Sequence, residues 1–319
     1  TAGTNYVFNA ATTAPFPTSS VNNVGDLTVN APITTNRNIT ISGNVTFASA
    51  KLTVREGDKL TVSPSTLFNG VSNSAYIVTE ANTTNGTVGT LGIAALAVNK
   101  TLPLGTATHY LPVSLNPTAS SDFTINVFQG VTENATPNGA ALTAGQKVNL
   151  VDATYNIVRE SGSGNCDVIL NWDAALEGSN FTTLANAQVG VTQYDGSYGS
   201  FVGPGDNTAN TITTTVTSFA PFIIGKVGTL PVTLISFSAK ASNQTSVLAW
   251  QTTSEVNLDR YEIQRSIDGV NFQTLGTVKA NNISGVFNYS FTDKSGYGRS
   301  YPFMACQMIL LNVSSSIRS

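Results

Sequence analysis

The sequence predicts an all-β protein in which short stacked β-rungs are followed by a β-sandwich and then by a C-terminal immunoglobulin-like or fibronectin type III-like sandwich. Three observations support this fold class. Only 10% of the 319 residues are charged, while Thr, Asn, Ser, Gly and Val are abundant, a mixture that favours strands and turns over helices. Short alternations of apolar residues and Thr recur near the N-terminus. Longer alternating segments, separated by turn signals, fill the rest of the chain.

The first expected domain, residues 1–74, holds an extended N-terminal segment and a repeated Thr-rich theme. Alternation places one set of side chains in a core and the other set in solvent, and Gly43 and Gly57 supply turns between the repeats. Strands this short and frequent predict a small solenoid, or a meander whose strands stack on one another. The repeats are Asp26–Val29, Asn38–Ile41, Asn44–Phe47, Lys51–Val54 and Lys59–Val62.

The second expected domain, residues 75–227, has longer strands separated by Gly-containing turns such as Asn85-Gly86 and Asn138-Gly139. Strands at this spacing predict a β-sandwich. The candidate strands are Ala75–Thr79, His109–Leu115, Phe123–Phe128, Thr154–Arg159, Asp167–Trp172, Gln188–Tyr194 and Ile212–Phe219.

The third expected domain, residues 228–319, reads as the C-terminal sandwich. Asp268-Gly269 predicts a tight hairpin between two of its strands. Trp250 and Tyr261 supply one large ring on each of two successive strands, so we expect both in the core between the sheets. The alternating segments are Val247–Trp250, Arg260–Arg265, Phe272–Val278 and Asn288–Thr292.

Charge and hydropathy exclude two classes of partner. The net charge is −3 and no basic cluster occurs, so we expect no nucleic acid partner. The longest apolar candidate, Thr90–Val98, falls far short of the roughly 20 residues that span a bilayer, so we expect no transmembrane segment. The chain starts at Thr1 among small polar residues, as a mature exported protein does. Cys166 and Cys306 are two free thiols or an interdomain disulfide, and the sequence leaves both open.

Several motifs resemble proteins that Bacteroidetes export by the type IX secretion system. The segments Leu230–Lys240 and Val247–Ser266 look like the module that often precedes the sorting domain of those proteins. The middle domain adds similar motifs, at Tyr76–Val78, Leu102–Gly105, Tyr110–Val113 and Ser218–Phe222. The resemblance implies a secreted or surface-attached product at the cell surface, and it implies no reaction.

The resemblance weakens near the C-terminus, and we expect the sorting domain of those proteins to be missing from this sequence. After Tyr301 the family pattern would continue as another strand, but this chain gives Pro302–Val313 instead. Proline within a strand belongs at an edge or a bulge. This segment is therefore either a specialised edge or imperfectly known sequence.

Residues for catalysis are sparse, and we expect no enzyme. His109 is the single histidine and lies beside no recognisable nucleophile motif, so a half-exposed strand residue is its ordinary interpretation. Asp167, Asp173 and Glu177 are the least implausible carboxylates for glycoside hydrolysis, which needs two of them within about 5 to 9 Å. Solvated turn residues are the alternative interpretation of all three.

Two ligand sites are weighed in the loop that follows the strand at Gln188–Tyr194. Asp195 and Asp206 bracket a Gly-rich segment whose oxygen atoms suit calcium, although it matches no EF-hand template. Calcium is the one cofactor that we consider, and an ordinary hairpin loop is the alternative. Tyr194, Tyr198 and Phe201 could stack on sugar rings, with packing inside the loop or the core as the alternative.

The function expected from these features is that of an extracellular structural or adhesive surface protein. Its sharper form is the subunit of a homo-oligomer or cell-surface filament, built by β-strand addition between copies. Tyr6 and Phe8, within the extended segment Thr4–Phe16, would dock into a neighbouring copy. The alternative is that this segment folds back on its own chain. The rival function is a secreted carbohydrate-binding module or polysaccharide-processing protein that contacts surface glycans.

Overall fold

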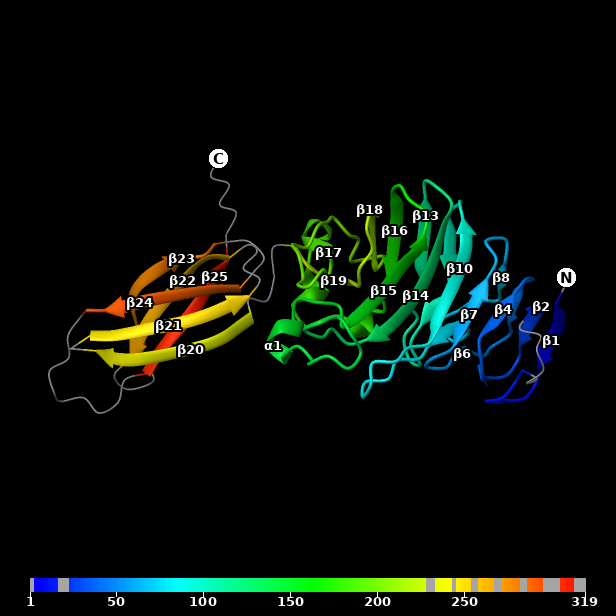
Figure 1. The fold of residues 1–319 in the computed structure, drawn as a ribbon, viewed down its shortest axis with the longest axis horizontal. Helices are drawn as coiled ribbons and strands as arrows, with labels where there is room; N and C mark the ends of the chain where they lie inside the picture. The colour runs from blue at the N-terminus through cyan, green and yellow to red at the C-terminus, as the bar shows by residue number, and fades with distance from the viewer. Residues whose placement is uncertain are drawn as a thin grey trace. The chain divides into compact units, whose positions relative to one another are not determined.

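The computed structural model describes residues 3–16, 23–227, 233–242, 245–253, 258–266, 271–281, 286–294 and 305–312. The predicted all-β class is confirmed (Figure 1). The chain divides into two compact units, of which the first holds Thr1–Gly196 and Val202–Val227 and the second holds Gly228–Ser319 with Ser197–Phe201. Helical structure in the described residues is limited to single turns, which are α1 (Ala144–Lys147), η1 (Ala174–Leu176), η2 (Phe181–Thr183) and η3 (Asn186–Gln188).

The first unit starts as a stack of short parallel strands, so the predicted solenoid-like arrangement is present. The strands form three rows, and each predicted repeat is one side of a coil rather than a whole coil. The first row is β1 (Thr4–Phe8), β2 (Asn23–Val29), β4 (Ile39–Ile41), β7 (Lys59–Val62) and β10 (Thr90–Leu96). The second row is the C-terminal half of β2, β5 (Val45–Phe47) and β8 (Phe68–Asn69). The third row is β3 (Ile33–Thr34), β6 (Leu52–Val54), β9 (Ile77–Thr79) and β12 (Leu104–Gly105).

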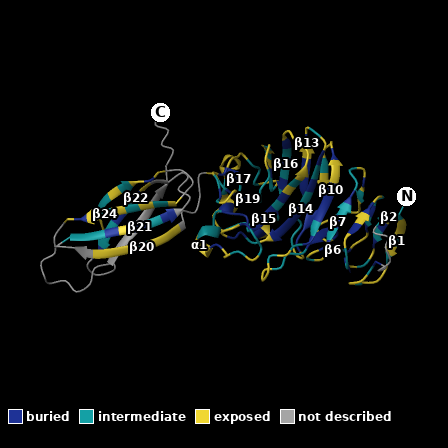
Figure 2. Ribbon diagram, viewed as in Figure 1, coloured by how far each residue is buried: buried dark blue, intermediate teal, exposed yellow. Residues whose placement is uncertain are grey.

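Alternation along these strands builds the core of the stack. In β6, Leu52 and Val54 are fully buried while Thr53 between them is half-buried. The same pattern recurs in β5 and β7, which gives the stack a buried interior (Figure 2). Gly57 turns the chain with a φ of +80°, as predicted, and Gly43 has an additional role, described below.

An antiparallel sandwich continues directly from the stack. Strand β10 pairs with parallel β7 on one side and with antiparallel β14 on the other, so one sheet runs from the stack into the sandwich. That sheet goes on through β14 (Ser121–Gln129), β15 (Ala153–Ser161), β19 (Phe222–Lys226) and β17 (Val189–Gln193). The second sheet is β11 (Lys100–Leu102), β13 (Val113–Pro117), β16 (Cys166–Asn171) and β18 (Thr211–Val216).

One hydrophobic core extends through both parts of the first unit. The expected boundary between residues 74 and 75 therefore falls inside this unit. The strand predicted at Ala75–Thr79 appears as β9, but it pairs with β6 and belongs to the stack rather than to the sandwich. The other expected boundary, between residues 227 and 228, coincides with the division between the two units.

In its described residues, the second unit consists of two antiparallel sheets of three strands each. Trp250 and Tyr261 lie in its core as predicted, one from each sheet, with ring centroids 5.4 Å apart. The hairpin expected at Asp268-Gly269 and the unusual Pro302 lie outside the described residues. The sheets are β20 (Thr233–Ser242), β21 (Thr245–Thr253) and β24 (Val286–Asp293), and β23 (Gln273–Lys279), β22 (Leu258–Ser266) and β25 (Ala305–Asn312).

Candidate functional site

The N-terminal segment folds back on its own chain in this structure. Strand β1 pairs in parallel with β2, and the rings of Tyr6 and Phe8 stack with centroids 5.9 Å apart. Phe16 is buried and packs edge-on against both rings, at 5.6 and 5.5 Å. The three rings cover the end of the stack's core. Docking of Tyr6 and Phe8 into another copy stays a prediction.

A ladder of side-chain oxygens holds β1 to the coils that follow it. Asn5 Oδ1 accepts a hydrogen bond from Asp26 N at 2.7 Å, and Asp26 Oδ1 accepts one from Asn44 N at 2.7 Å. Asn44 Oδ1 in turn accepts from Leu67 N at 2.9 Å. Each side chain thus bonds a backbone amide one coil further along, where the turn interrupts the regular strand pairing.

Glycines beside this ladder let the coils approach closely. A Cβ on Gly25 would lie 2.2 Å from Asn5 Oδ1 and 2.6 Å from Gly3 O. A Cβ on Gly43 would lie 2.3 Å from Asp26 Oδ1 and 2.8 Å from Gly25 O. Gly43 therefore serves close packing between coils as well as the turn that the sequence predicts.

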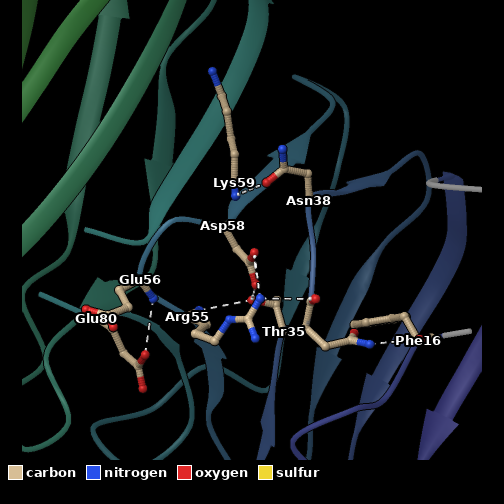
Figure 3. Close-up of polar contacts among 9 residues, drawn as sticks. Phe16, Thr35, Asn38, Arg55, Glu56, Asp58, Lys59 and Glu80 are labelled. Carbon is tan, nitrogen blue, oxygen red and sulfur yellow. Dashed lines mark hydrogen bonds and ion pairs between the residues drawn. The ribbon is translucent and has the colours of Figure 1, made fainter. Parts of the chain in front are cut away.

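A second set of polar contacts joins the coils on another corner (Figure 3). Thr35 Oγ1 donates to Asp58 Oδ2 at 2.8 Å and accepts from Arg55 N at 3.0 Å. Arg55 also bonds Asp58 Oδ1, at 3.2 Å, which fixes the buried carboxylate. Asn38 Oδ1 accepts from Lys59 N at 2.8 Å in the same coil-to-coil manner.

One edge of β1 has no strand beside it in the part of the chain that the structure describes, where β1 pairs with β2 alone. We call this its open edge. Phe8 O accepts hydrogen bonds from Asn30 N and Ala31 N, so the backbone polar groups of Phe8 face β2. Because these groups alternate along a strand, those of Val7 face the other way, and the Val7 side chain is 59% exposed.

In the loop predicted to bind calcium, the carboxylate of Asp206 is hydrogen-bonded to groups of the protein itself. Asp206 Oδ1 accepts hydrogen bonds from Thr208 N at 2.9 Å, Ala209 N at 3.0 Å and Asn186 Nδ2 at 3.3 Å. The bonds from Ala209 and Thr208 hold the pKa of Asp206 below its usual range. Asp195 is exposed. The described residues contain no group of three or more His, Cys, Asp or Glu side chains placed to hold a metal, and calcium binding stays a prediction.

The three aromatic residues suggested for sugar stacking differ in burial. Tyr198 and Phe201 are buried, while Tyr194 is half-buried. A sugar ring stacks on an exposed aromatic face, so the burial of two rings counts against an open platform made of all three. Stacking at this loop stays a prediction.

The acidic residues considered for hydrolysis have separate partners. Asp167 and Asp173 lie six residues apart along extended chain, about 20 Å, which is too far for a pair of hydrolytic carboxylates. Asp167 accepts from Thr215 Oγ1 at 2.6 Å, and Glu177 accepts from Trp172 Nε1 at 2.8 Å. Asp173 Oδ2 instead lies 2.9 Å from His109 Nδ1.

The His109–Asp173 pair was not foreseen from the sequence. Burial raises the pKa of Asp173, but hydrogen bonds from Ala175 N and His109 outweigh it and lower that pKa overall. The His109 side chain is 16% exposed, and the residue lies in the loop before β13 rather than in a strand. The pair joins the loop before β13 to the end of β16, which are 64 residues apart, so no local motif signals it.

Cys166 is buried and its thiol is free, while the side chain of Cys306 lies outside the described residues. The described part of the chain has no helix with the length and apolar character that crossing a membrane requires. Comparison with protein-family models, with curated proteins and with solved structures finds no match to this chain.

Proposed function

We propose that this chain is an extracellular structural or adhesive protein, and that copies of it associate by β-strand addition at the outer edge of β1. The observation that carries the proposal is the open edge beside Val7. A strand edge with free amide and carbonyl groups pairs readily with another strand, and the solvent-exposed Val7 has no charge to discourage this. An extracellular location is supported by the resemblance to exported surface proteins.

A second open edge supports assembly into a chain of copies. Within the described residues β25 pairs with β22 alone and is one of several strands that lie at the edge of a sheet. Pairing of two different surfaces gives head-to-tail association, which produces an open filament where the rotation does not close into a ring. In this proposal the occupant of the β1 edge is a second copy of this chain.

The test compares two substitutions that introduce the same charge at equally exposed valines. Val7→Lys places a lysine on the open edge, while Val98→Lys places one in the loop between β10 and β11, where the valine is 58% exposed. Electron microscopy and light scattering of the purified protein should show filaments for wild type and Val98→Lys, and dispersed particles for Val7→Lys. Dispersed wild-type particles, or filaments that persist in Val7→Lys, would contradict the assembly.

Location is tested separately in the cells that make the protein. Brief protease treatment of intact cells should remove the protein from the cell fraction, unless it has already been released into the medium. Protein that stays protected until the cells are lysed would contradict an extracellular role.

A further inference from the structure

A cavity of about 480 Å³ lies in the first unit, beside the His109–Asp173 pair. Four chain segments line it, namely the turn at Asn73, the approach to β13, the end of β16 and the turn before β18. A volume of this size lies within the range of small-ligand pockets. The lining residues include Asn73, Tyr110, Asn171, Trp172, Asp173 and Asn210.

The cavity is lined by polar groups that the protein leaves available. The side-chain amides of Asn73, Asn171 and Asn210 and the hydroxyl of Tyr110 make no hydrogen bond to any other described residue. Each amide can both donate and accept, and a phenol can do the same. Asn210 also has a φ of +53°, a left-handed conformation that Asn tolerates at turns and that Gly adopts at no steric cost.

The remaining lining groups are held in fixed orientations. Asp173 receives hydrogen bonds from Ala175 N at 3.0 Å and pairs with His109 at 2.9 Å, so His109 acts as a positioning residue behind it. Trp172 donates its indole N–H to Glu177 and packs edge-on against a neighbouring phenyl ring. Tyr110 rests against the buried ring of Tyr76, with centroids 5.1 Å apart. Such fixed groups lose little entropy when they bind a ligand.

The chemistry of the lining selects one class of ligand. The described lining residues include no Lys or Arg, and Asp173 contributes a negative charge, which disfavours anions. Three amides and a phenol match hydroxyl groups that donate and accept at once, and the half-buried ring of Tyr110 matches the apolar C–H faces between them, whereas the ring of Trp172 is buried. We propose that this cavity binds a short neutral saccharide. That the saccharide is the ligand of an adhesive protein rests on the proposed function. The binding site itself does not require copies of the chain to associate.

The test begins with an array of neutral mono- to tetrasaccharides, followed by calorimetric titration of the best binder. Asn210→Gly is the most informative variant, because glycine accepts the positive φ while the amide is lost. Tyr110→Phe removes only the hydroxyl. The control Asn165→Gly makes the same Asn-to-Gly substitution in an exposed loop away from the cavity. We expect Asn210→Gly and Tyr110→Phe each to weaken binding about tenfold, with Asn165→Gly unchanged.

Two results would overturn this proposal. One is an array on which the folded wild-type protein binds no saccharide. The other is an affinity that Asn210→Gly and Tyr110→Phe leave unchanged, or that Asn165→Gly lowers equally. Light scattering on the same samples separates the two proposals, because filaments without saccharide binding would contradict only the cavity assignment. Saccharide binding by a protein that stays monomeric would contradict only self-assembly.

Discussion

The two ends of the parallel stack differ in whether the outermost strand is paired on both of its edges. At one end β10 is covered by antiparallel β14, and Leu91 and Ile93 are almost wholly buried. At the other end β1 has β2 on one side and, among the described residues, no strand on the other. Strands of similar composition thus lie inside a sheet or at its edge, depending on whether another strand pairs with their outer side. The covered end therefore contributes to stability, and our proposal places association at the other end.

The largest expected effect comes from the middle of the stack, where both neighbours of a strand are present. Leu60 in β7 is fully buried and pairs in register with Ile39 and Leu91. Leu60→Ala should lower the free energy of unfolding by about 3 kcal/mol, because it removes buried methyl groups and leaves a cavity. Urea denaturation measures this, with exposed Val98→Ala as a control expected to stay within about 0.5 kcal/mol of wild type. A loss below about 1 kcal/mol for Leu60→Ala would mean that this row is not core.

A smaller effect is expected where β1 joins the stack. Gly25→Ala should cost about 1 to 3 kcal/mol, because the new methyl group meets Gly3 O and Asn5 Oδ1 and pushes β1 away from β2. Gly145→Ala makes the same change inside α1, where nothing lies within 4 Å, and should be neutral or slightly stabilising. Limited proteolysis should release the N-terminal segment faster in Gly25→Ala alone. Equal behaviour of the two variants would contradict close packing at this corner.

The ladder of side-chain oxygens formed by Asn5, Asp26 and Asn44 should contribute less again to the free energy of unfolding. Asp26→Ala removes the oxygen that accepts from Asn44 N and should cost about 1 kcal/mol in urea denaturation. Asp26→Asn keeps an oxygen at that position and should cost distinctly less. If both variants lose the same stability, the negative charge rather than the hydrogen bond would be what matters there.

The covered end should lose stability in acid, because the Asp122 carboxylate of β14 accepts a hydrogen bond from β10. Asp122 Oδ1 accepts from Ala95 N at 2.6 Å and Asp122 Oδ2 accepts from Ser161 at 2.8 Å, bonds that lower the pKa of Asp122. A lowered folded-state pKa stabilises the fold above the ordinary pKa of about 3.8, and that stabilisation fades as pH falls through the lowered value. The Ala95 amide shift, followed by NMR, should therefore titrate with a midpoint below 3.8. A midpoint at or above it, or the same titration in Asp122→Asn, would contradict this link.

Local patterns predicted much of the fold. Each Thr-rich repeat is a strand of the stack, and the alternation of Leu52, Thr53 and Val54 gives the observed burial. Trp250 and Tyr261 are core residues, as large rings on neighbouring alternating strands should be. These features depend on short-range periodicity, which a sequence displays directly.

Long-range pairing could not be predicted in the same way. Nothing local to Thr90–Leu96 shows that β10 takes a parallel partner on one side and an antiparallel one on the other. The cavity residues Asn73 and Asn210 lie far apart in the chain, and their convergence depends on the whole first unit. The ladder did leave a signal, since Gly25-Asp26 and Gly43-Asn44 repeat the same dipeptide chemistry just before or within a strand.

The most direct test of the open edge is amide hydrogen exchange along β1, measured by NMR in dilute and in concentrated protein. In dilute protein the Phe8 amide should exchange slowly, because it faces β2, while the Val7 amide should exchange fast. Concentration should then slow exchange at Val7 alone. A Val7 amide that is already protected in dilute protein, or a Phe8 amide that exchanges as fast as Val7, would contradict a docked β1 with one open edge.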